Sequence, residues 1–173
     1  MIIARPDASE FAPFYSGYVG KVSPPDPAAM LRNQLTVFER LRSTPDDLGN
    51  FQYATGKWSV KEVLGHMADA ERVFAYRLVR IARGDQTPLA GFDENAWAAA
   101  APHGRRHITA VVDELIAVRR STLALIDSID DAQIGNSALA NNLPVSARAL
   151  CWIIPGHAQH HLDILRDRYH VKI

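Results

Sequence analysis

Apolar residues recur every three or four positions in four long stretches of the chain, which is the period of an amphipathic helix. The first stretch follows Asp26-Pro27, where an N-cap residue precedes proline at the first helical position, and it ends before Pro45. The second stretch follows Ser59-Val60-Lys61-Glu62, which has the spacing of a capping box, and it ends at Gly84. Both ends of the first two predicted helices are therefore marked by recognisable residues.

The third stretch begins at Ile108 and repeats apolar residues through Ile129. The fourth opens at Pro144 or Ser146 and carries an apolar stripe that continues to Leu165. No segment shows the alternating pattern of a β-strand. Four amphipathic helices, each with one apolar stripe, predict an all-α protein that folds as a four-helix bundle.

Two parts of the chain lie outside these helices. Residues 1–25 are rich in proline, glycine, serine and tyrosine and have no helical period, so we expect an irregular N-terminal arm before a bundle domain at residues 26–173. A long connection between helices two and three, from Gly84 to His107, has one short helical candidate at residues 93–98. Connections of this length inside a compact domain are often functional.

Composition and charge narrow the classes of function. The 173 residues suffice for one domain, and 19 basic residues balance 19 acidic ones, which argues against a general nucleic-acid surface. No apolar run reaches the length of a membrane span, and the N-terminal segment lacks the apolar core of a signal peptide, so we expect a cytoplasmic protein. A single cysteine, Cys151, excludes an internal disulfide and a multi-cysteine zinc site, and we interpret it as a small core residue.

His157 and His161 are the strongest candidates for metal ligands among the seven histidines. One helical turn separates them, so both rings project from the apolar stripe of the fourth helix. Two hydrogen-bonded core histidines are the plainer interpretation, but two buried imidazoles are costly unless each finds a partner, and a shared cation supplies one. His103 and His107 have the same spacing, but they flank two arginines in a poorly helical context, so we do not expect them to bind metal.

His66 lies on the flank of the apolar stripe of the second helix, where it can supply a third ligand. A lone histidine at such a position is commonly a hydrogen-bonded boundary residue instead. Three neutral imidazoles with a fourth position left open form the ligand set of a catalytic zinc site rather than that of a closed structural one.

Three segments of the chain together resemble the DinB-like (YfiT-like) superfamily of metal-binding four-helix bundles: GKWSVKEVLGHMADAERVFAYR, ARGDQTPLAGFDENAW and ALCWIIPGHAQHHLDILRDRY. They cover most of the chain in the order typical of that family. The resemblance implies that His66, His157 and His161 hold one divalent transition metal, often zinc or nickel. It also implies a homodimer, since homodimers are frequent in the superfamily.

The resemblance also implies a range of functions. Some members of the superfamily transfer thiols such as bacillithiol or mycothiol, or act as thiol-dependent isomerases, and many have no known activity. We therefore expect a divalent-metal-dependent hydrolase or thiol S-transferase that acts on a small molecule, with the metal as a Lewis acid. The alternative is a non-catalytic, stress-associated metal-binding bundle in which the ion is structural and ties helix two to helix four.

Two charged residues near His66 have two interpretations each. Asp69 can accept the second ring N–H of His66, as carboxylates near metal ligands often do, or it can be a solvated surface acid, which is the favoured interpretation. Arg77 can contact an anionic substrate or can pair with Asp93 or Glu94, and the pairing is favoured.

Pro155 removes one hydrogen bond from the fourth helix and should bend it, either outside the site or so that the bend sets the approach of His157. Aromatic residues are assigned to packing first and to the site second: Phe14, Tyr15 and Tyr18 of the arm, and Trp58, Phe74 and Trp152 near the helices.

Overall fold

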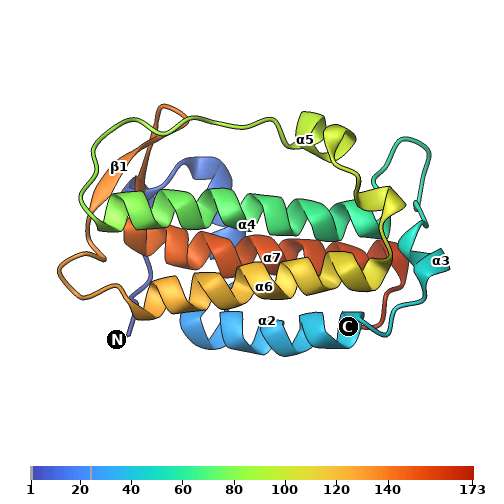
Figure 1. Ribbon diagram of the computed structural model, residues 1–173. Coiled ribbons are helices and arrows are strands. Elements are labelled where there is room, and N and C mark those ends of the chain that lie inside the picture. Colours follow the sequence, from blue (N-terminus) through green and yellow to red (C-terminus); the bar gives the residue numbers. More distant parts are fainter. Residues whose placement is uncertain (1, 24) are drawn as a thin grey trace.

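Four long helices make up the body of the protein (Figure 1). The computed structural model describes residues 2–23 and 25–173. The long helices are α2 (Pro27–Leu41), α4 (Val60–Ala82), α6 (Ile108–Asp127) and α7 (Ala147–Tyr169). All four helices predicted from the apolar pattern are therefore present. None of the helices in the described part of the chain combines the length and apolar character that a bilayer crossing demands.

Side chains cap the N-terminal ends of these helices. The Asp26 carboxylate accepts a hydrogen bond from a backbone amide in the first turn of α2, at 3.0 Å. Ser59 and Glu62 form the predicted capping box, in which the Ser59 amide donates to the Glu62 carboxylate at 2.7 Å and the Ser59 hydroxyl accepts from the Glu62 amide at 3.3 Å. Ser146 caps α7 in the same way, accepting from the Ala149 amide at 2.9 Å. The starts of the two helices that carry the candidate histidines, α4 and α7, are thus fixed locally.

The directions of the helices explain the long connection. The colours in Figure 1 show that α2 and α7 run one way along the bundle and that α4 and α6 run the other way. Both α4 and α2 pack against α6 and α7. Because α4 and α6 are neighbours that run in the same direction, the chain must return along the length of the bundle after α4 ends and before α6 begins. Residues 83–107 make this return, and we call them the return segment.

The return segment contains a short helix, α5 (Glu94–Ala100), and a 3-10 turn at His103–Arg105. The Asp93 carboxylate caps α5 by accepting hydrogen bonds from the amides of Asn95 and Ala96, both at 3.0 Å. The short helix expected at residues 93–98 is therefore present. It packs against α4, and Figure 1 shows it above the N-terminal half of that helix.

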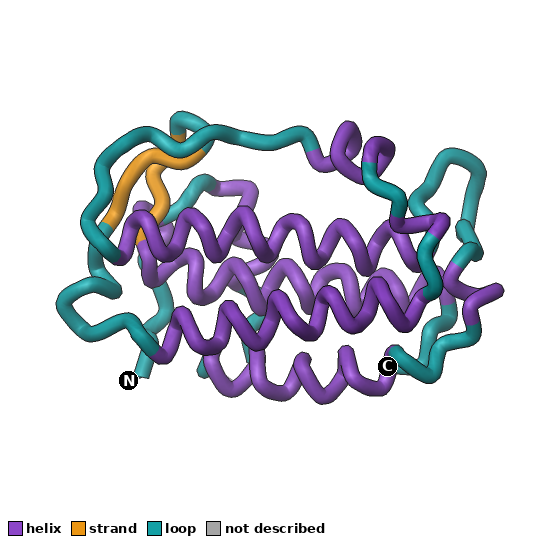
Figure 2. The backbone as a smooth tube through the Cα atoms, in the orientation of Figure 1, coloured by secondary structure: helices purple, strands orange, loops and turns teal. Residues whose placement is uncertain are grey.

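A small antiparallel hairpin corrects the expectation that the chain has no strand. β1 (Ser137–Ala140) pairs with β2 (Leu143–Ser146), and Figure 2 shows both strands at one end of the bundle. Asn141 and Asn142 form the turn with φ values of 53° and 61°, which a tight hairpin turn requires and asparagine tolerates. Each strand has only four residues, too few for an alternating pattern to stand out.

The N-terminal arm is more regular than expected. It forms two 3-10 turns, Ala8–Glu10 and Pro13–Tyr15, and a short helix, α1 (Ser16–Val19), that packs on α7. A Cβ atom on Gly156 of α7 would lie 2.0 Å from the Tyr18 carbonyl oxygen, so only glycine permits this approach. Another short helix, α3 (Asp46–Gly49), lies between α2 and α4. Elements this short leave no periodic signal in a sequence.

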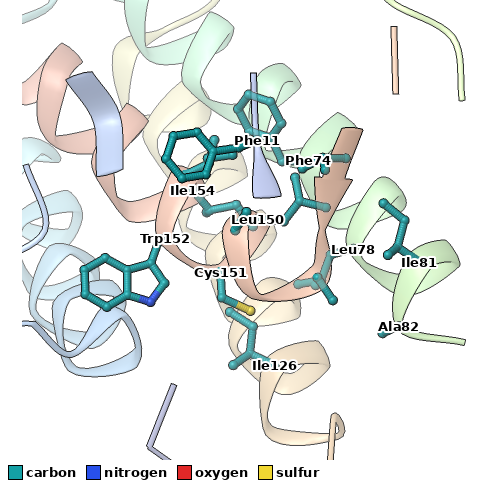
Figure 3. Close-up of a cluster of buried hydrophobic side chains, with 14 of the residues drawn as sticks. Phe11, Phe74, Leu78, Ile81, Ala82, Ile126, Leu150, Cys151, Trp152 and Ile154 are labelled. Atoms are coloured by element: carbon teal, nitrogen blue, oxygen red, sulfur yellow. The ribbon is translucent and has the colours of Figure 1, made fainter. Parts of the chain in front are cut away.

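Two clusters of buried apolar residues fill the bundle. Figure 3 shows one of them, in which Leu150 and Ile154 of α7 lie in the same cluster as Phe74 and Leu78 of α4. Trp152 belongs to this cluster and is fully buried, as expected of a core residue.

A buried ion pair joins α4 to α6. The Arg119 guanidinium binds both carboxylate oxygens of Glu71 at 2.8 Å, and the two side chains are 0% and 4% exposed. Arg119 also donates to the side-chain oxygen of Gln34 at 2.8 Å, and the Gln34 amide donates to the Pro155 carbonyl at 2.9 Å. α7 remains helical through Pro155. The network therefore holds the part of α7 that immediately precedes His157.

Candidate metal centre

Three histidine rings meet at the interface of α4 and α7. The Nε2 atom of His157 lies 3.2 Å from that of His66 and 3.1 Å from that of His161. All three side chains are buried, and one ligand atom from each lies within 4.8 Å of the others. The structure therefore brings together the three residues that the sequence singled out.

The spacing of these nitrogen atoms fits a coordinated transition metal. Zinc–nitrogen bonds of about 2.0–2.1 Å in a tetrahedron place neighbouring nitrogens about 3.3 Å apart. The two separations of 3.1 and 3.2 Å are close to that value. The three atoms cannot all satisfy one another by hydrogen bonding, because a neutral imidazole carries a proton on only one nitrogen. A cation that accepts all three lone pairs resolves this conflict, so the residues present fit the ion.

Burial keeps these imidazoles neutral. Desolvation lowers the pKa of His66 to about 4, and the charges of Glu94 and Asp69 oppose that shift. Burial, together with the neighbouring rings, lowers the pKa values of His157 and His161 well below the usual range. Neutral histidine is the form that offers a lone pair to a metal. The three residues are therefore in their ligating form at neutral pH.

The three histidines line a pocket of about 270 Å³, which we call the aromatic pocket. Six aromatic side chains form most of its wall: Phe14, Tyr15 and Tyr18 of the arm, Trp58 before α4, Phe74 of α4 and Phe92 of the return segment. Glu94, in the first turn of α5, adds a carboxylate. The sequence favoured plain packing for five of these rings; the structure places them at the site, and Phe74 also belongs to the core.

A second pocket of about 270 Å³ adjoins the aromatic pocket. Trp58 and His161 line both pockets, and the Trp58 ring centroid lies 4.8 Å from that of His66. α5 contributes to both as well, since Glu94 lines the aromatic pocket and Asn95 lines the second one. Sequence reasoning missed these two α5 residues as site residues. The available signals were the unusual length of the return segment and the cap at Asp93.

Asp69 contacts a histidine other than His66. Among the hydrogen bonds of residues 2–23 and 25–173, none joins Asp69 to His66; its carboxylate meets His103 Nε2 at 3.3 Å and Arg72 at 3.1 Å. The hydrogen bond with His103 lowers the pKa of Asp69. His103 packs so closely on α4 that a Cβ atom on Gly65 would lie 2.3 Å from its ring. Asp69 is therefore a partly exposed acid whose hydrogen bond goes to His103, and it ties the return segment to α4.

Other candidate residues stand apart from the three histidines. His107 is exposed and caps α6 by accepting a hydrogen bond from the Thr109 amide, so it forms no site with the buried His103. Burial raises the pKa of Cys151 to about 12, in keeping with an unreactive core residue.

Arg77 is buried on α4, and its side chain donates to the Ala90 carbonyl at 2.7 Å. Its Nε atom has no hydrogen-bond partner within the described residues. Within residues 2–23 and 25–173 Arg77 forms no ion pair with Asp93 or Glu94; Asp93 caps α5, and Glu94 lines the aromatic pocket. Arg77 does not line that pocket; its hydrogen bond to the Ala90 carbonyl holds the return segment on α4, and its contact with a substrate stays a prediction.

Comparisons with known proteins agree with the observed fold. The family model of the DinB superfamily matches residues 29–165. Among solved structures, YfiT from Bacillus subtilis is described as a probable metal-dependent hydrolase with an unusual four-helix bundle topology. It matches with a TM-score of 0.69 and 18% sequence identity, over 84% of this chain and 89% of that chain, a likeness that shows the fold alone. No curated protein matches the chain. Since the family model covers most of its length, the chain belongs to the DinB superfamily.

Proposed function

We propose that this protein is a metal-dependent hydrolase that acts on a small molecule. The observation that supports this most strongly is the convergence of three neutral imidazole nitrogens at the wall of a pocket. A divalent ion held there would act as a Lewis acid and lower the pKa of a water molecule or thiol that binds to it. YfiT from Bacillus subtilis, described as a probable metal-dependent hydrolase, points to the same class.

The chain supplies the positioning. His66, His157 and His161 would hold the ion, and zinc or nickel is expected because imidazole suits both metals. The Tyr18 ring meets the His157 ring edge-on at 5.3 Å, and Trp58 packs against His66, so neither imidazole can turn freely. The remaining rings of the aromatic pocket exclude water and offer an apolar surface to the substrate.

Metal analysis of purified variants tests the ligand set. We expect one divalent ion per chain in the wild type and its loss in His157→Ala. His160→Ala is the matched control, because His160 lies on the same helix outside the three-histidine cluster and should leave the metal content unchanged. Hydrolysis of a panel of small esters and amides should follow the metal content. Equal metal content in the wild type and His157→Ala would contradict the proposal.

A thiol S-transferase is the second candidate, with a bacillithiol- or mycothiol-type thiol as one substrate. The second pocket favours it, because two pockets that share His161 and Trp58 leave room for two molecules beside one metal. The third candidate is a bundle in which the ion only ties α4 to α7. Adding a small thiol to cobalt-substituted protein separates these candidates. A new sulfur-to-cobalt absorption band shows a position open to ligands, whereas an unchanged spectrum favours a structural ion.

The proposal includes a homodimer and a cytoplasmic location. Tyr76 and Trp97 are 52% and 45% exposed, which leaves aromatic surface for a second copy of the chain. Light scattering on the purified protein measures the oligomeric state, and fractionation of cells measures the location.

A further inference from the structure

The lining of the aromatic pocket favours ligands of one sign of charge. Its wall carries six aromatic side chains and one carboxylate, and within residues 2–23 and 25–173 no lysine or arginine contributes to it. The faces of aromatic rings are electron-rich and attract cations that approach to within about 6 Å. A carboxylate among such faces strengthens the attraction. The lining therefore favours a positively charged group over a negatively charged one.

The Glu94 carboxylate acts on groups from different parts of the site. Its negative charge reaches His66 on α4, and it reaches Tyr15 and Tyr18 on the arm. Burial is the main reason that the pKa values of the two tyrosines are raised. The Arg77 guanidinium opposes the rise at Tyr15 more strongly than the charge of Glu94 adds to it, whereas at Tyr18 Glu94 adds to the rise without that opposition. In the described part of the chain Glu94 has no ion-pair partner. The carboxylate is therefore close to the rings and free to receive a cationic ligand.

We propose that the aromatic pocket binds the ammonium-bearing part of the substrate, a positively charged nitrogen attached to an apolar body. This rests on the proposed function and names the substrate class that the site would take. The ring faces and the Glu94 carboxylate recognise the ammonium group. With a divalent ion held by His66, His157 and His161, the ammonium would be repelled from the histidines and would lie beside Glu94, so that the bond to be cleaved would face the histidines. The substrate is then oriented by charge as well as by shape.

The positive charge of Arg77 would favour an anionic ligand only if its guanidinium reached that ligand. It is 4% exposed, donates to the Ala90 carbonyl, and acts on Tyr15 from outside the pocket wall. Glu94 lines the pocket and Arg77 does not, so the charged side chain on the pocket wall is a carboxylate. Binding of an anionic probe of the same shape shows whether Glu94 or Arg77 determines the charge that the pocket prefers.

The test uses three probes that differ in charge but hardly in shape. Choline carries a quaternary ammonium, 3,3-dimethylbutan-1-ol replaces that nitrogen by carbon, and 3,3-dimethylbutanoate is an anion. Each is titrated by two-dimensional NMR into the full chain, both metal-free and loaded with zinc. The variants are Glu94→Gln and, as a matched control, Glu39→Gln, which removes an exposed carboxylate on α2.

We expect choline to bind at least about fivefold more tightly than its neutral isostere, which is the ratio that about 1 kcal/mol of cation–π and ionic attraction produces. Glu94→Gln should remove most of this preference, and Glu39→Gln should keep it. Equal binding of choline and the alcohol, tighter binding of the anion to the metal-free protein, a preference that survives Glu94→Gln, or no saturable choline binding would each overturn the proposal. Because binding is also measured without metal, and metal content separately, failure of the substrate class is distinct from failure of the metal centre.

Discussion

Replacing Gly156 with alanine should detach the arm from the bundle while leaving the three histidines on their helices. The added Cβ would lie 2.0 Å from the carbonyl oxygen of Tyr18 and 3.0 Å from its Cα atom. Carbon and oxygen atoms in close contact are about 3.3 Å apart or more, so α1 and α7 must separate by roughly 1.3 Å. Both obstructing atoms belong to the backbone, so no side-chain rotation can relieve the clash.

The expected cost follows from two opposing effects. Overpacking costs about 1–3 kcal/mol, whereas alanine favours a helix interior over glycine by up to about 1 kcal/mol. We therefore expect Gly156→Ala to lower the free energy of unfolding by about 1–2 kcal/mol. Release of the arm removes Tyr15 and Tyr18 from the aromatic pocket, so choline affinity should fall while metal content is retained.

Gly17→Ala is the matched control for this experiment. Gly17 lies in α1, and a Cβ atom there would meet no atom within 4 Å. Urea unfolding measures the stability of both variants, and hydrogen exchange of residues 13–22 measures the attachment of the arm. Wild-type protection of the arm in Gly156→Ala, together with an unchanged unfolding midpoint, would refute the reasoning.

The buried ion pair, the buried thiol and the neutral histidines lead to three further expectations. Glu71→Ala leaves the Arg119 guanidinium buried without its carboxylate and should lower the free energy of unfolding by about 3–5 kcal/mol. The control, Glu39→Ala, removes an exposed carboxylate and should lower it by about 0–1 kcal/mol. Similar denaturation midpoints for the two variants would contradict this expectation. Cys151, whose pKa burial raises to about 12, should react with a thiol reagent only as fast as the protein unfolds, and rapid labelling of the native protein would argue against it. In metal-free protein, burial lowers the pKa of His66 from 6.5 to about 4, so the unfolded state binds more protons between these values. The free energy of unfolding should then decrease as the pH falls from 6.5 toward 4, and a flat pH profile would count against the assignment.

The helices and their histidines could be predicted because their determinants are local. The cap at Ser59 and the apolar repeat after it are short-range features, and each is realised in α4. The one-turn spacing of His157 and His161 places both rings on one face wherever that helix packs. The ligand role of His66 does not follow from spacing alone, because only the packing of α4 on α7 brings its Nε2 to 3.2 Å from that of His157.

The walls of the site could not be predicted, because they depend on contacts between distant segments. Tyr18 reaches α7 only because residue 156 has no side chain, and His103 reaches α4 only because residue 65 has none. A glycine inside a helix is compatible with flexibility, a kink or a close approach, and the sequence does not distinguish them. The hydrogen bonds of Asp69 with His103 and of Arg77 with the Ala90 carbonyl could not be predicted for the same reason, since both partners belong to the return segment.

The parallel course of α4 and α6 has a consequence for how this protein can diversify. Because of this arrangement the chain must return along α4, and the return segment places Phe92, Glu94 and Asn95 in the walls of the two pockets beside the histidines. The metal ligands therefore stand on rigid helices, whereas much of the surface that would select a ligand belongs to a loop, where substitutions and insertions are tolerated. New ligand preferences can therefore arise through substitutions and insertions in the return segment, while the helices and the three histidines stay the same.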